Sequence, residues 1–357
     1  MLQQKDIKGR RVAVALSGGV DSAVAALLLQ EQGADVVAMT LLLQEHDDGA
    51  KAAAVAELLS VPLKIIDGRS CFRASVMEAF AESYSCGETP NPCVLCNKKL
   101  KFGMLLDAAK EEGAAFLATG HYVQRVDRDG TVQLHQGKDP QKDQSYFLYA
   151  LPQERLPFLL FPLGGLSKQE VRHIAQEARL PLAAQKDSQD ICFVPDGDYT
   201  AVLNSLRPDI AQKGTIVDLE GRVIGHHEGI IHYTIGQRKG LGLSDRVGEN
   251  NDPLYVVRLD SARNEVVVGP RDALAVRDVF LQDINWLGGD IPAGGLVVTT
   301  RLRSTMAPVS ARFFMDSLDG KGAGHLHLES PLYGVAPGQA GVIYDGTCLL
   351  GGGVISL

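Results

Sequence analysis

Short apolar segments and longer segments with helical periodicity alternate along the first half of the chain. The apolar segments are rich in branched residues and only a few residues long, which is typical of buried strands. They cover residues 12–16, 36–43, 63–66 and 116–118. Between them, apolar residues recur at helical spacing in residues 22–32, 50–59, 72–84 and 98–112. The alternation predicts an α/β fold with a doubly wound parallel sheet, whose ligands bind at the carboxyl ends of the strands.

Two local signals add elements to this sheet. An alternating segment, residues 123–137, contains Asp129 and Gly130 at its centre, and this pattern predicts a hairpin with a tight turn. Further along, Ser167 and Glu170 have the spacing of a capping box, which predicts the start of a helix.

The pattern changes from about residue 207. Glycine becomes frequent and the strand-like segments become short, which predicts a small β-rich module followed by a C-terminal β-barrel. We therefore expect three domains, at residues 1–206, 207–275 and 276–357.

Composition bears on the compartment of the protein. No apolar run is long enough to cross a membrane. Basic residues precede the first apolar segment, as in a signal peptide, but Gly18, Gly19 and Asp21 interrupt that segment. We expect a cytoplasmic protein with no membrane partner, in which the six cysteines do not form a disulfide framework.

The net charge of −8 argues against nucleic-acid binding that depends on total charge. Local clusters of basic residues matter more for such binding, and two are present. They are Lys98, Lys99 and Lys101, and Arg301 and Arg303. Each cluster is equally compatible with an ordinary solvated surface.

Residues 15–22, Ala-Leu-Ser-Gly-Gly-Val-Asp-Ser, connect the first predicted strand to the first predicted helix. Gly18 and Gly19 permit a close backbone approach, and the N–H groups at a helix N-terminus suit a phosphate. The lysine of a GxxxxGK[ST] loop is missing, so transfer of a γ-phosphate is not the expected chemistry. Asp21 either helps to hold Mg²⁺ or orients the loop. A plain strand–turn–helix connection is the alternative.

Cys93 and Cys96 follow a loop with two prolines and begin a helical segment rich in lysine. A helix N-terminus and nearby ammonium groups lower the pKa of a thiol, so we expect reactive thiolates here. The pair is compatible with redox chemistry, metal binding or sulfur relay, and also with two buried thiols. A second pair with the spacing of a four-cysteine zinc site is absent from the sequence.

The remaining candidates are weaker when each is taken alone. Cys192 lies between Ile191 and Phe193, and a cysteine in that setting is more often part of an apolar core. Residues 120–122 and 137–148 are polar segments beside apolar ones, which by themselves are compatible with a satisfied histidine and a helix cap.

Taken together, the motifs resemble the bacterial tRNA-specific 2-thiouridylase family (MnmA/TrmU), within the superfamily of PP-loop ATP pyrophosphatases. The matching strings are SGGVDS, TPNPCVLCNKKLKF, ATGHY, KDQSYFL, DICF, YTIGQRKGLG and APGQA followed by GGG, in family order over nearly the whole chain. The first string alone indicates the superfamily, whereas the cysteine strings and KDQSYFL are specific. The resemblance implies a PP-loop catalytic domain first and a tRNA-binding barrel last.

The resemblance also implies roles for individual residues. ATP and Mg²⁺ are expected at Ala15, Leu16, Ser17, Gly18, Gly19, Val20, Asp21 and Ser22, with Leu41 and Gly120 beside the nucleotide. The implied catalytic residues are Cys192, which would carry a persulfide, and Cys96, a nucleophile that forms a disulfide with it between turnovers. The target base and the tRNA are expected at Asn91, Pro92, Cys93, His121, Lys142, Asp143, Gln144, Arg301, Leu302 and Gln339.

The implied reaction is ATP-dependent sulfur transfer to the 2-position of the wobble uridine of tRNA. Adenylation turns the carbonyl oxygen into a leaving group, diphosphate departs, and cysteine-borne sulfur then displaces AMP. A single-stranded anticodon loop makes it cheap to unstack the base. The implied partners are the anticodon stem-loop and a sulfur-donor protein, such as a cysteine desulfurase or a persulfide carrier.

Two departures from the family leave alternatives open. Some members carry aspartate where this chain has Cys93; with a cysteine there, Cys93, Cys96 and Cys192 could ligate three irons of a [4Fe-4S] cluster. The stretch between Leu41 and Lys51 is also shorter than in the family.

Two other functions compete with this interpretation. One is a different adenylating ligase, which gives no reason for the three cysteines. The other is an RNA-binding module with a vestigial nucleotide site, and the intact motifs argue against it.

Overall fold

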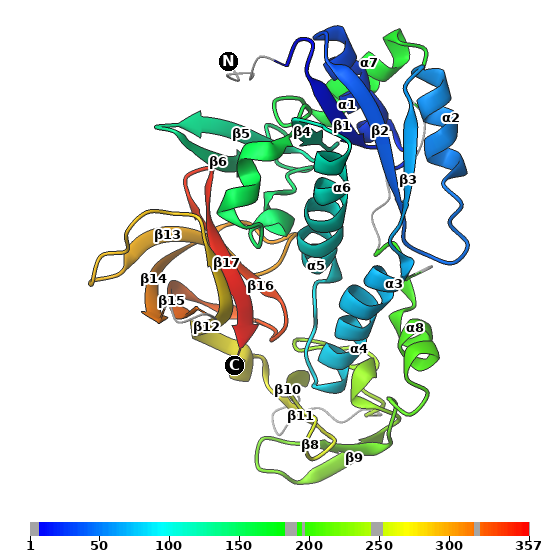
Figure 1. The fold of residues 1–357 in the computed structure, drawn as a ribbon. Helices are drawn as coiled ribbons and strands as arrows, with labels where there is room; N and C mark the ends of the chain where they lie inside the picture. Colours follow the sequence, from blue (N-terminus) through cyan, green and yellow to red (C-terminus); the bar gives the residue numbers. More distant parts are fainter. Residues whose placement is uncertain (1–6, 183–190, 195–196, 244–252, 318–321, 357) are drawn as a thin grey trace.

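The computed structural model describes residues 7–182, 191–194, 197–243, 253–317 and 322–356 (Figure 1). Within these residues a parallel sheet, a small mixed sheet and a large antiparallel sheet follow one another along the chain. This arrangement confirms the fold class expected from the sequence. Residues 186–190, the polar segment before Cys192, lie outside the described ranges.

The N-terminal sheet is parallel, with the strand order β3-β2-β1-β4-β7. Its strands are β1 Arg11–Ala15, β2 Asp35–Leu42, β3 Leu63–Asp67, β4 Phe116–Ala118 and β7 Leu159–Leu160. Val12 and Val14 of β1 pack into one hydrophobic cluster, and Ala13 packs into another. Because both faces are covered, the central strands are apolar throughout rather than alternating. Strand β7 was not expected, since two residues leave no periodic pattern.

Helices cover the two faces of this sheet. On one face lie α1 Val20–Glu31, α2 Ala50–Leu58 and α7 Lys168–Glu177. The other face packs against α6 Leu105–Glu111. Helix α7 begins with the predicted capping box: the Glu170 N–H donates to Ser167 Oγ, and the Ser167 N–H donates to the Glu170 carboxylate. The predicted arrangement, a parallel sheet with helices on both faces, is therefore confirmed.

Two helical segments differ from their expected form. In place of one helix over residues 72–84, the chain forms α3 Arg69–Phe72, the π-helix η1 Arg73–Met77 and α4 Glu78–Ser85. In place of a helix starting at Lys98, it forms α5 Pro92–Cys96, the π-helix η2 Asn97–Met104 and then α6. The second helix starts early because Pro92 is its first residue, where the fixed φ of proline suits a helix and its missing N–H costs nothing.

The predicted hairpin is present as β5 Val123–Arg128 and β6 Thr131–Gln136. Both turn residues have positive φ, 51° at Asp129 and 78° at Gly130, as a two-residue hairpin turn requires. The hairpin also joins the C-terminal sheet, since His135 of β6 pairs with Cys348. A segment of the N-terminal region thus extends the barrel, which the sequence did not indicate.

The remaining strands form the two other sheets. The middle sheet has the order β10-β11-β8-β9, and the barrel strands β12-β15-β14-β13-β16-β17 close through the pairing of β12 with β17. The middle strands are β8 Gly214–Val217, β9 Val223–His227, β10 Tyr255–Asp260 and β11 Glu265–Gly269. The barrel strands are β12 Ala275–Trp286, β13 Leu296–Arg301, β14 Val309–Ser317, β15 Ala323–Tyr333, β16 Ala340–Asp345 and β17 Cys348–Ser356.

Short helices connect these sheets. Helix α8 Tyr199–Leu206, which the sequence did not predict, packs beside α4 and precedes the middle sheet (Figure 1). The remaining turns of 3₁₀-helix are η3 Ser145–Leu148, η4 Gln153–Phe158, η6 Ile230–His232 and η7 Arg271–Leu274.

The barrel packs directly against the N-terminal sheet. Barrel residues Val342 and Tyr344 share one hydrophobic cluster with Leu105 and Leu117. The Asn285 side chain of β12 donates to the backbone carbonyl of Tyr149, at 2.6 Å. The two sheets therefore share one hydrophobic cluster.

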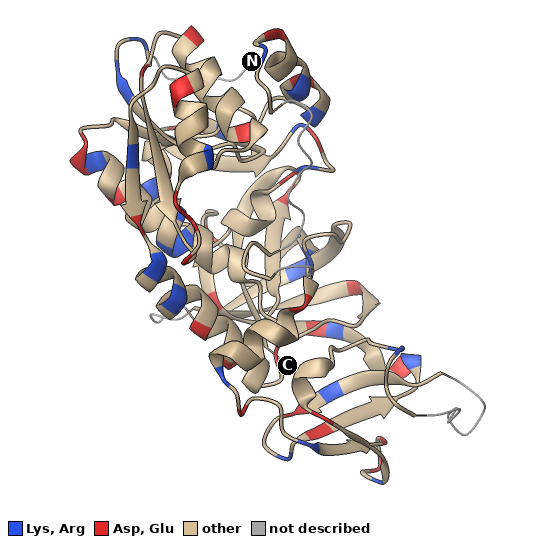
Figure 2. Cartoon of the chain, turned by 90° about the vertical axis from the view of Figure 1, so that its right-hand side faces the viewer, with Lys and Arg blue, Asp and Glu red and all other residues tan. Residues whose placement is uncertain are grey.

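Charged residues of both signs lie on the side of the molecule that Figure 2 shows. Lys and Arg are interspersed there with Asp and Glu. None of the helices in the described part of the chain combines the length and the apolarity needed to span a membrane.

Candidate active site

The loop after β1, residues 16–19, is held by hydrogen bonds to the first turn of α1. The Ser17 N–H donates to Ser22 Oγ at 3.2 Å, and the Ser22 hydroxyl donates to the Gly19 carbonyl at 3.0 Å. Gly18 has φ of +79°, and Gly19 precedes α1 without a side-chain cap. The first N–H groups of α1 are therefore available to an anion, as expected for a phosphate-binding loop.

Residues predicted near the nucleotide lie around this loop. A Cβ added to Gly120, just after β4, would be 2.9 Å from backbone atoms of Asp21 and Ser22, so only glycine permits this approach. Leu41 lies near the carboxyl end of β2 and is partly buried between two core clusters. Both residues thus lie at the edge of the sheet where ligands of such folds bind.

Asp21 has partners within the protein. Its Oδ1 accepts from the Tyr122 hydroxyl at 2.7 Å, and Lys168 Nζ donates to Oδ1 and Oδ2 at 2.8 and 2.9 Å. The Lys168 side chain is only 10% exposed. Of the two roles expected for Asp21, these contacts favour orientation of the loop. The sequence did not reveal Lys168 and Tyr122 as partners of Asp21, since they lie 147 and 101 positions away from it.

The cysteine pair is held in the short helix α5. Cys96 is buried and Cys93 is half-buried. Burial raises the pKa of both thiols, and the nearby Lys101 ammonium only partly offsets this effect. The expected lowering of these pKa values is wrong because desolvation of a thiolate outweighs the effect of the lysine.

Cys192 lies close enough to the pair for its thiol to interact with both. The residue as a whole is exposed, yet its thiol is shielded by its neighbours. Burial, followed by the thiols of Cys96 and Cys93, raises the pKa of Cys192 to about 11. The fold thus brings together three thiols that are distant in sequence, and Lys101 opposes the rise in pKa at each of them.

These thiols do not form a ready metal site. Among the residues that the structure describes, no group of three or more His, Cys, Asp or Glu side chains is arranged to hold a metal ion. As they stand, Cys93, Cys96 and Cys192 do not fit an iron–sulfur cluster.

The short segment after β2 contacts the Cys192 segment. Gln44 Nε2 donates to the Cys192 carbonyl at 2.9 Å. Arg69 also binds this segment, because its guanidinium donates to the carbonyls of Gln44 and Asp47 at 3.2 and 2.9 Å. The sequence did not reveal this contact of Gln44, since its partner is a backbone atom 148 residues away.

Several residues predicted to contact tRNA have partners inside the protein. His121 is buried beside Phe102 and Phe161 and pairs with Thr119 Oγ1 at 2.8 Å. Burial and Lys101 hold the pKa of His121 well below its usual range, so its imidazole is neutral. The Gln144 side chain accepts from the Tyr122 N–H at 3.0 Å. Lys142, which is also predicted to contact tRNA, is half-buried.

Asp143 and Arg301 form an ion pair between the N-terminal region and the barrel. Arg301 donates to the Asp143 carboxylate at 2.8 Å, and the two side chains are only 11% and 3% exposed. The same carboxylate accepts from the N–H groups of Gly137 and Ser145. Leu302 beside Arg301 is buried in the barrel core.

The barrel also holds the loop before the cysteine pair. Gln339 Nε2 donates to the Thr89 carbonyl at 2.7 Å, and the Thr89 N–H donates to the Pro337 carbonyl at 2.8 Å. Asn91 is the residue before α5 and Pro92 is buried. The predicted base-binding residues are thus placed by a contact between the first and last parts of the chain.

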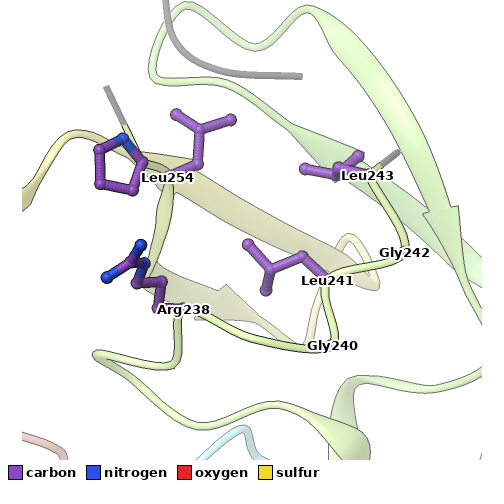
Figure 3. A pocket seen from close by; sticks show the side chains of 7 residues that line it. Arg238, Gly240, Leu241, Gly242, Leu243 and Leu254 are labelled. Carbon is purple, nitrogen blue, oxygen red and sulfur yellow. The ribbon is translucent and has the colours of Figure 1, made fainter. Parts of the chain in front are cut away.

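A separate open pocket of about 440 Å³ lies in the middle sheet region (Figure 3). It is lined by Arg238, Gly240, Leu241, Gly242, Leu243, Pro253 and Leu254. These residues include the end of the YTIGQRKGLG string. The strands of the middle sheet lie at the opposite end of the molecule from β1 and α1 (Figure 1), and the residues that line the pocket include none of residues 15–22, so the pocket is not the nucleotide site.

Comparison with known proteins matches three consecutive segments to protein families. The segments are described as a tRNA methyl transferase HUP domain over residues 10–196, a tRNA methyl transferase PRC-barrel domain over residues 203–270 and an aminomethyltransferase beta-barrel domain over residues 276–355.

One solved structure found in the comparison is described as the U34-tRNA thiolase NcsA from Methanococcus maripaludis with its [4Fe-4S] cluster. It shares 20% sequence identity, covers 56% of this chain and 65% of its own, and has a TM-score of 0.35.

Curated relatives match at much higher identity. The tRNA-specific 2-thiouridylase MnmA of Parvibaculum lavamentivorans is 48% identical, over 99% of this chain and 94% of its own length. The protein of the same name from Methylorubrum populi is 51% identical, over 97% of this chain and 93% of its own. With such relatives along nearly its whole length, and one family matched over more than half of it, the chain belongs to the family of tRNA-specific 2-thiouridylases.

Proposed function

We propose that the protein transfers sulfur to the 2-position of the wobble uridine of tRNA and consumes ATP in doing so. The observation that carries this proposal is the convergence of Cys93, Cys96 and Cys192, together with a phosphate-binding loop at the carboxyl edge of the parallel sheet. The names of the relatives support the tRNA substrate.

In the proposed first step, the loop at residues 15–22 binds the phosphates of ATP, with Leu41 and Gly120 beside the nucleotide. The uridine O2 attacks the α-phosphorus, an O–P bond forms, and the bond to diphosphate breaks. Backbone N–H groups at the start of α1 stabilise the charge that develops on the phosphates. The Asp21–Lys168 pair keeps the loop in shape.

In the proposed second step, Cys192 carries the outer sulfur of a persulfide. The Cys96 thiolate attacks the Cys192 sulfur, the persulfide S–S bond breaks, and a Cys96–Cys192 disulfide forms. The released sulfide attacks C2 of the base, and the C–O bond to AMP breaks. An external thiol must then reduce the disulfide before the next turnover. Lys101, which favours the thiolate form of all three cysteines, supports this chemistry.

The proposal extends to partners, compartment and domains. The anticodon stem-loop is the substrate, and a cysteine desulfurase or persulfide carrier is the sulfur donor. All six cysteines are free, which supports the reducing cytoplasm as the compartment. The three matched segments, residues 10–196, 203–270 and 276–355, support domain boundaries at residues 1–206, 207–275 and 276–357.

The test is nucleoside analysis of an anticodon stem-loop RNA incubated with the protein, ATP and a persulfide donor. Wild-type protein should form 2-thiouridine only when ATP is present. Cys192→Ser should reduce the product at least about a hundredfold while ATP binding is retained, because the sulfur carrier is lost.

Cys86→Ser is the matched control for this test. Cys86 is an exposed thiol outside the three-thiol cluster, so its loss should leave the product unchanged. Full activity of Cys192→Ser would overturn the relay. AMP release with a small acceptor in the absence of tRNA would instead favour a different adenylating ligase.

A further inference from the structure

Lys51 lies directly against the phosphate-binding loop. It is the second residue of α2, and a Cβ added to Gly18 would be 2.6 Å from Lys51 Cβ and 2.9 Å from its carbonyl carbon. Gly18 also has positive φ, so both its conformation and its lack of a side chain are required for this approach. The lysine stem therefore starts at the loop, although it is distant from the loop in sequence.

The loop needs a cation that its own sequence does not supply. A triphosphate carries several negative charges, whereas residues 15–22 contain no lysine or arginine and one aspartate. Lys168 neutralises that aspartate and uses its ammonium group for the purpose. Positive charge from another element therefore stabilises a bound triphosphate further, beside the N–H groups of α1.

Lys51 can supply this positive charge. Its residue is exposed, and it has no hydrogen bond or ion pair within the part of the chain that the structure describes. A lysine ammonium on a flexible stem is well suited to bind phosphate as a point charge.

The segment that carries Lys51 is fixed at its base. Gly49 has φ of +74° before α2, its N–H donates to Asp47 Oδ1, and the Ala50 N–H donates to Asp48 Oδ1. Arg69 donates to the Asp47 carbonyl. These contacts place the start of α2 over the loop, while the side chain of Lys51 remains free to reach a ligand.

We propose that Lys51 is a phosphate-binding residue of the ATP site, which places its ammonium on the diphosphate part of ATP and stabilises diphosphate as it leaves. This inference rests on the proposed function, because it requires that the loop binds ATP. It assigns to α2 the cation that a Walker loop carries within its own sequence.

The test compares Lys51→Gln and Lys51→Arg with wild type by calorimetric titration without tRNA, using ATP, inorganic diphosphate and AMP as ligands. Lys51→Gln should weaken ATP and diphosphate binding about tenfold or more, since a tenfold change corresponds to one lost charged contact. AMP binding should remain within about twofold of wild type, and Lys51→Arg should retain most of the diphosphate affinity.

Lys213→Gln is the control for net charge. Lys213 is exposed and pairs with Glu228 beside the middle sheet, so its loss should leave ATP binding unchanged. Wild-type diphosphate affinity in Lys51→Gln, or an equal loss of AMP affinity that indicates a packing role, would overturn the inference. Failure of wild-type protein to bind ATP would instead overturn the proposed function itself.

Discussion

At the residue scale, the environment of the three thiols of the site favours their protonated form. Burial is the first cause of the raised pKa values of Cys93, Cys96 and Cys192, and Lys101 is the cation that opposes it at each thiol. A buried neutral thiol is protected from unwanted oxidation and alkylation, because the thiolate is the reactive form. Reaction then requires the attacking thiol to lose its proton first.

This leads to a prediction on the pH dependence of alkylation. With a pKa of about 11, Cys192 is protonated at lower pH and only about one thiol in a thousand is ionised at pH 8. Its alkylation by iodoacetamide should therefore keep rising up to about pH 11, as measured by mass spectrometry of the peptide that contains it.

Lys101→Gln should move this profile to higher pH, because the cation that favours the thiolate is lost. Lys99→Gln removes an equal charge from the exposed side of the same helical segment and should leave the profile in place. A Cys192 profile that levels off near pH 8 would contradict the storage of a protonated thiol.

At the element scale, backbone conformation decides how the loop meets its neighbours. Gly18 and Gly19 look equivalent in the sequence, but only Gly18 has positive φ and lies against α2. Gly19 has φ of −95°, and a Cβ there would meet only Ser17 Oγ at 3.6 Å. The π-helices η1 and η2 are a second case, since their i→i+5 bonding leaves no signal in hydrophobic spacing.

We expect Gly18→Ala and Gly19→Ala to differ in stability. Gly18→Ala should cost about 1–3 kcal/mol of unfolding free energy, because alanine is strained at that φ and its methyl group overlaps Lys51. Gly19→Ala should cost under about 1 kcal/mol, since its φ and surroundings accept a methyl group. Urea unfolding of the two variants measures the difference, and equal losses would show that the approach of α2 does not constrain Gly18.

At the scale of the whole molecule, the three sheets meet around the loop that precedes the cysteine pair. Thr89 is bound by Gln339 and Pro337 of the barrel region, and a Cβ on Gly87 would be 3.0 Å from Leu259 of β10. Asn97 donates to the Phe147 carbonyl beside the N-terminal sheet. The position of the cysteines therefore depends on the packing of distant parts of the chain.

The buried pair between Asp143 and Arg301 should contribute strongly to this packing. Asp143→Asn leaves the Arg301 guanidinium without its charged partner, which should cost about 3–5 kcal/mol. Asp35→Asn breaks an exposed pair with Arg11, with side chains 55% and 52% exposed, and should cost about 0–1 kcal/mol.

The fluorescence of Trp286 measures these losses at the barrel. Trp286 is the only tryptophan in the sequence. It lies in β12 and stacks on Phe313, with 5.2 Å between the ring centroids. An Asp143→Asn barrel that unfolds at the wild-type urea concentration would contradict a role for this pair in holding the barrel.

The sequence by itself determined the local elements of this protein. Continuous apolar runs predicted the strands β1, β2 and β4, because a parallel strand is buried on both faces. Turn and cap residues at Asp129, Gly130 and Ser167 predicted the hairpin and the start of α7. The phosphate-binding loop and the cysteine motifs were also visible, since their chemistry resides in adjacent residues.

Only the tertiary structure decided which distant residues meet and what charge their groups carry. Lys168 reaches Asp21 across 147 positions, Gln44 reaches the Cys192 carbonyl across 148, and Lys51 lies on Gly18 through packing of α2. The thiol pKa values rise rather than fall for the same reason. Desolvation depends on every atom packed around a group, whereas sequence spacing reveals only its neighbours along the chain.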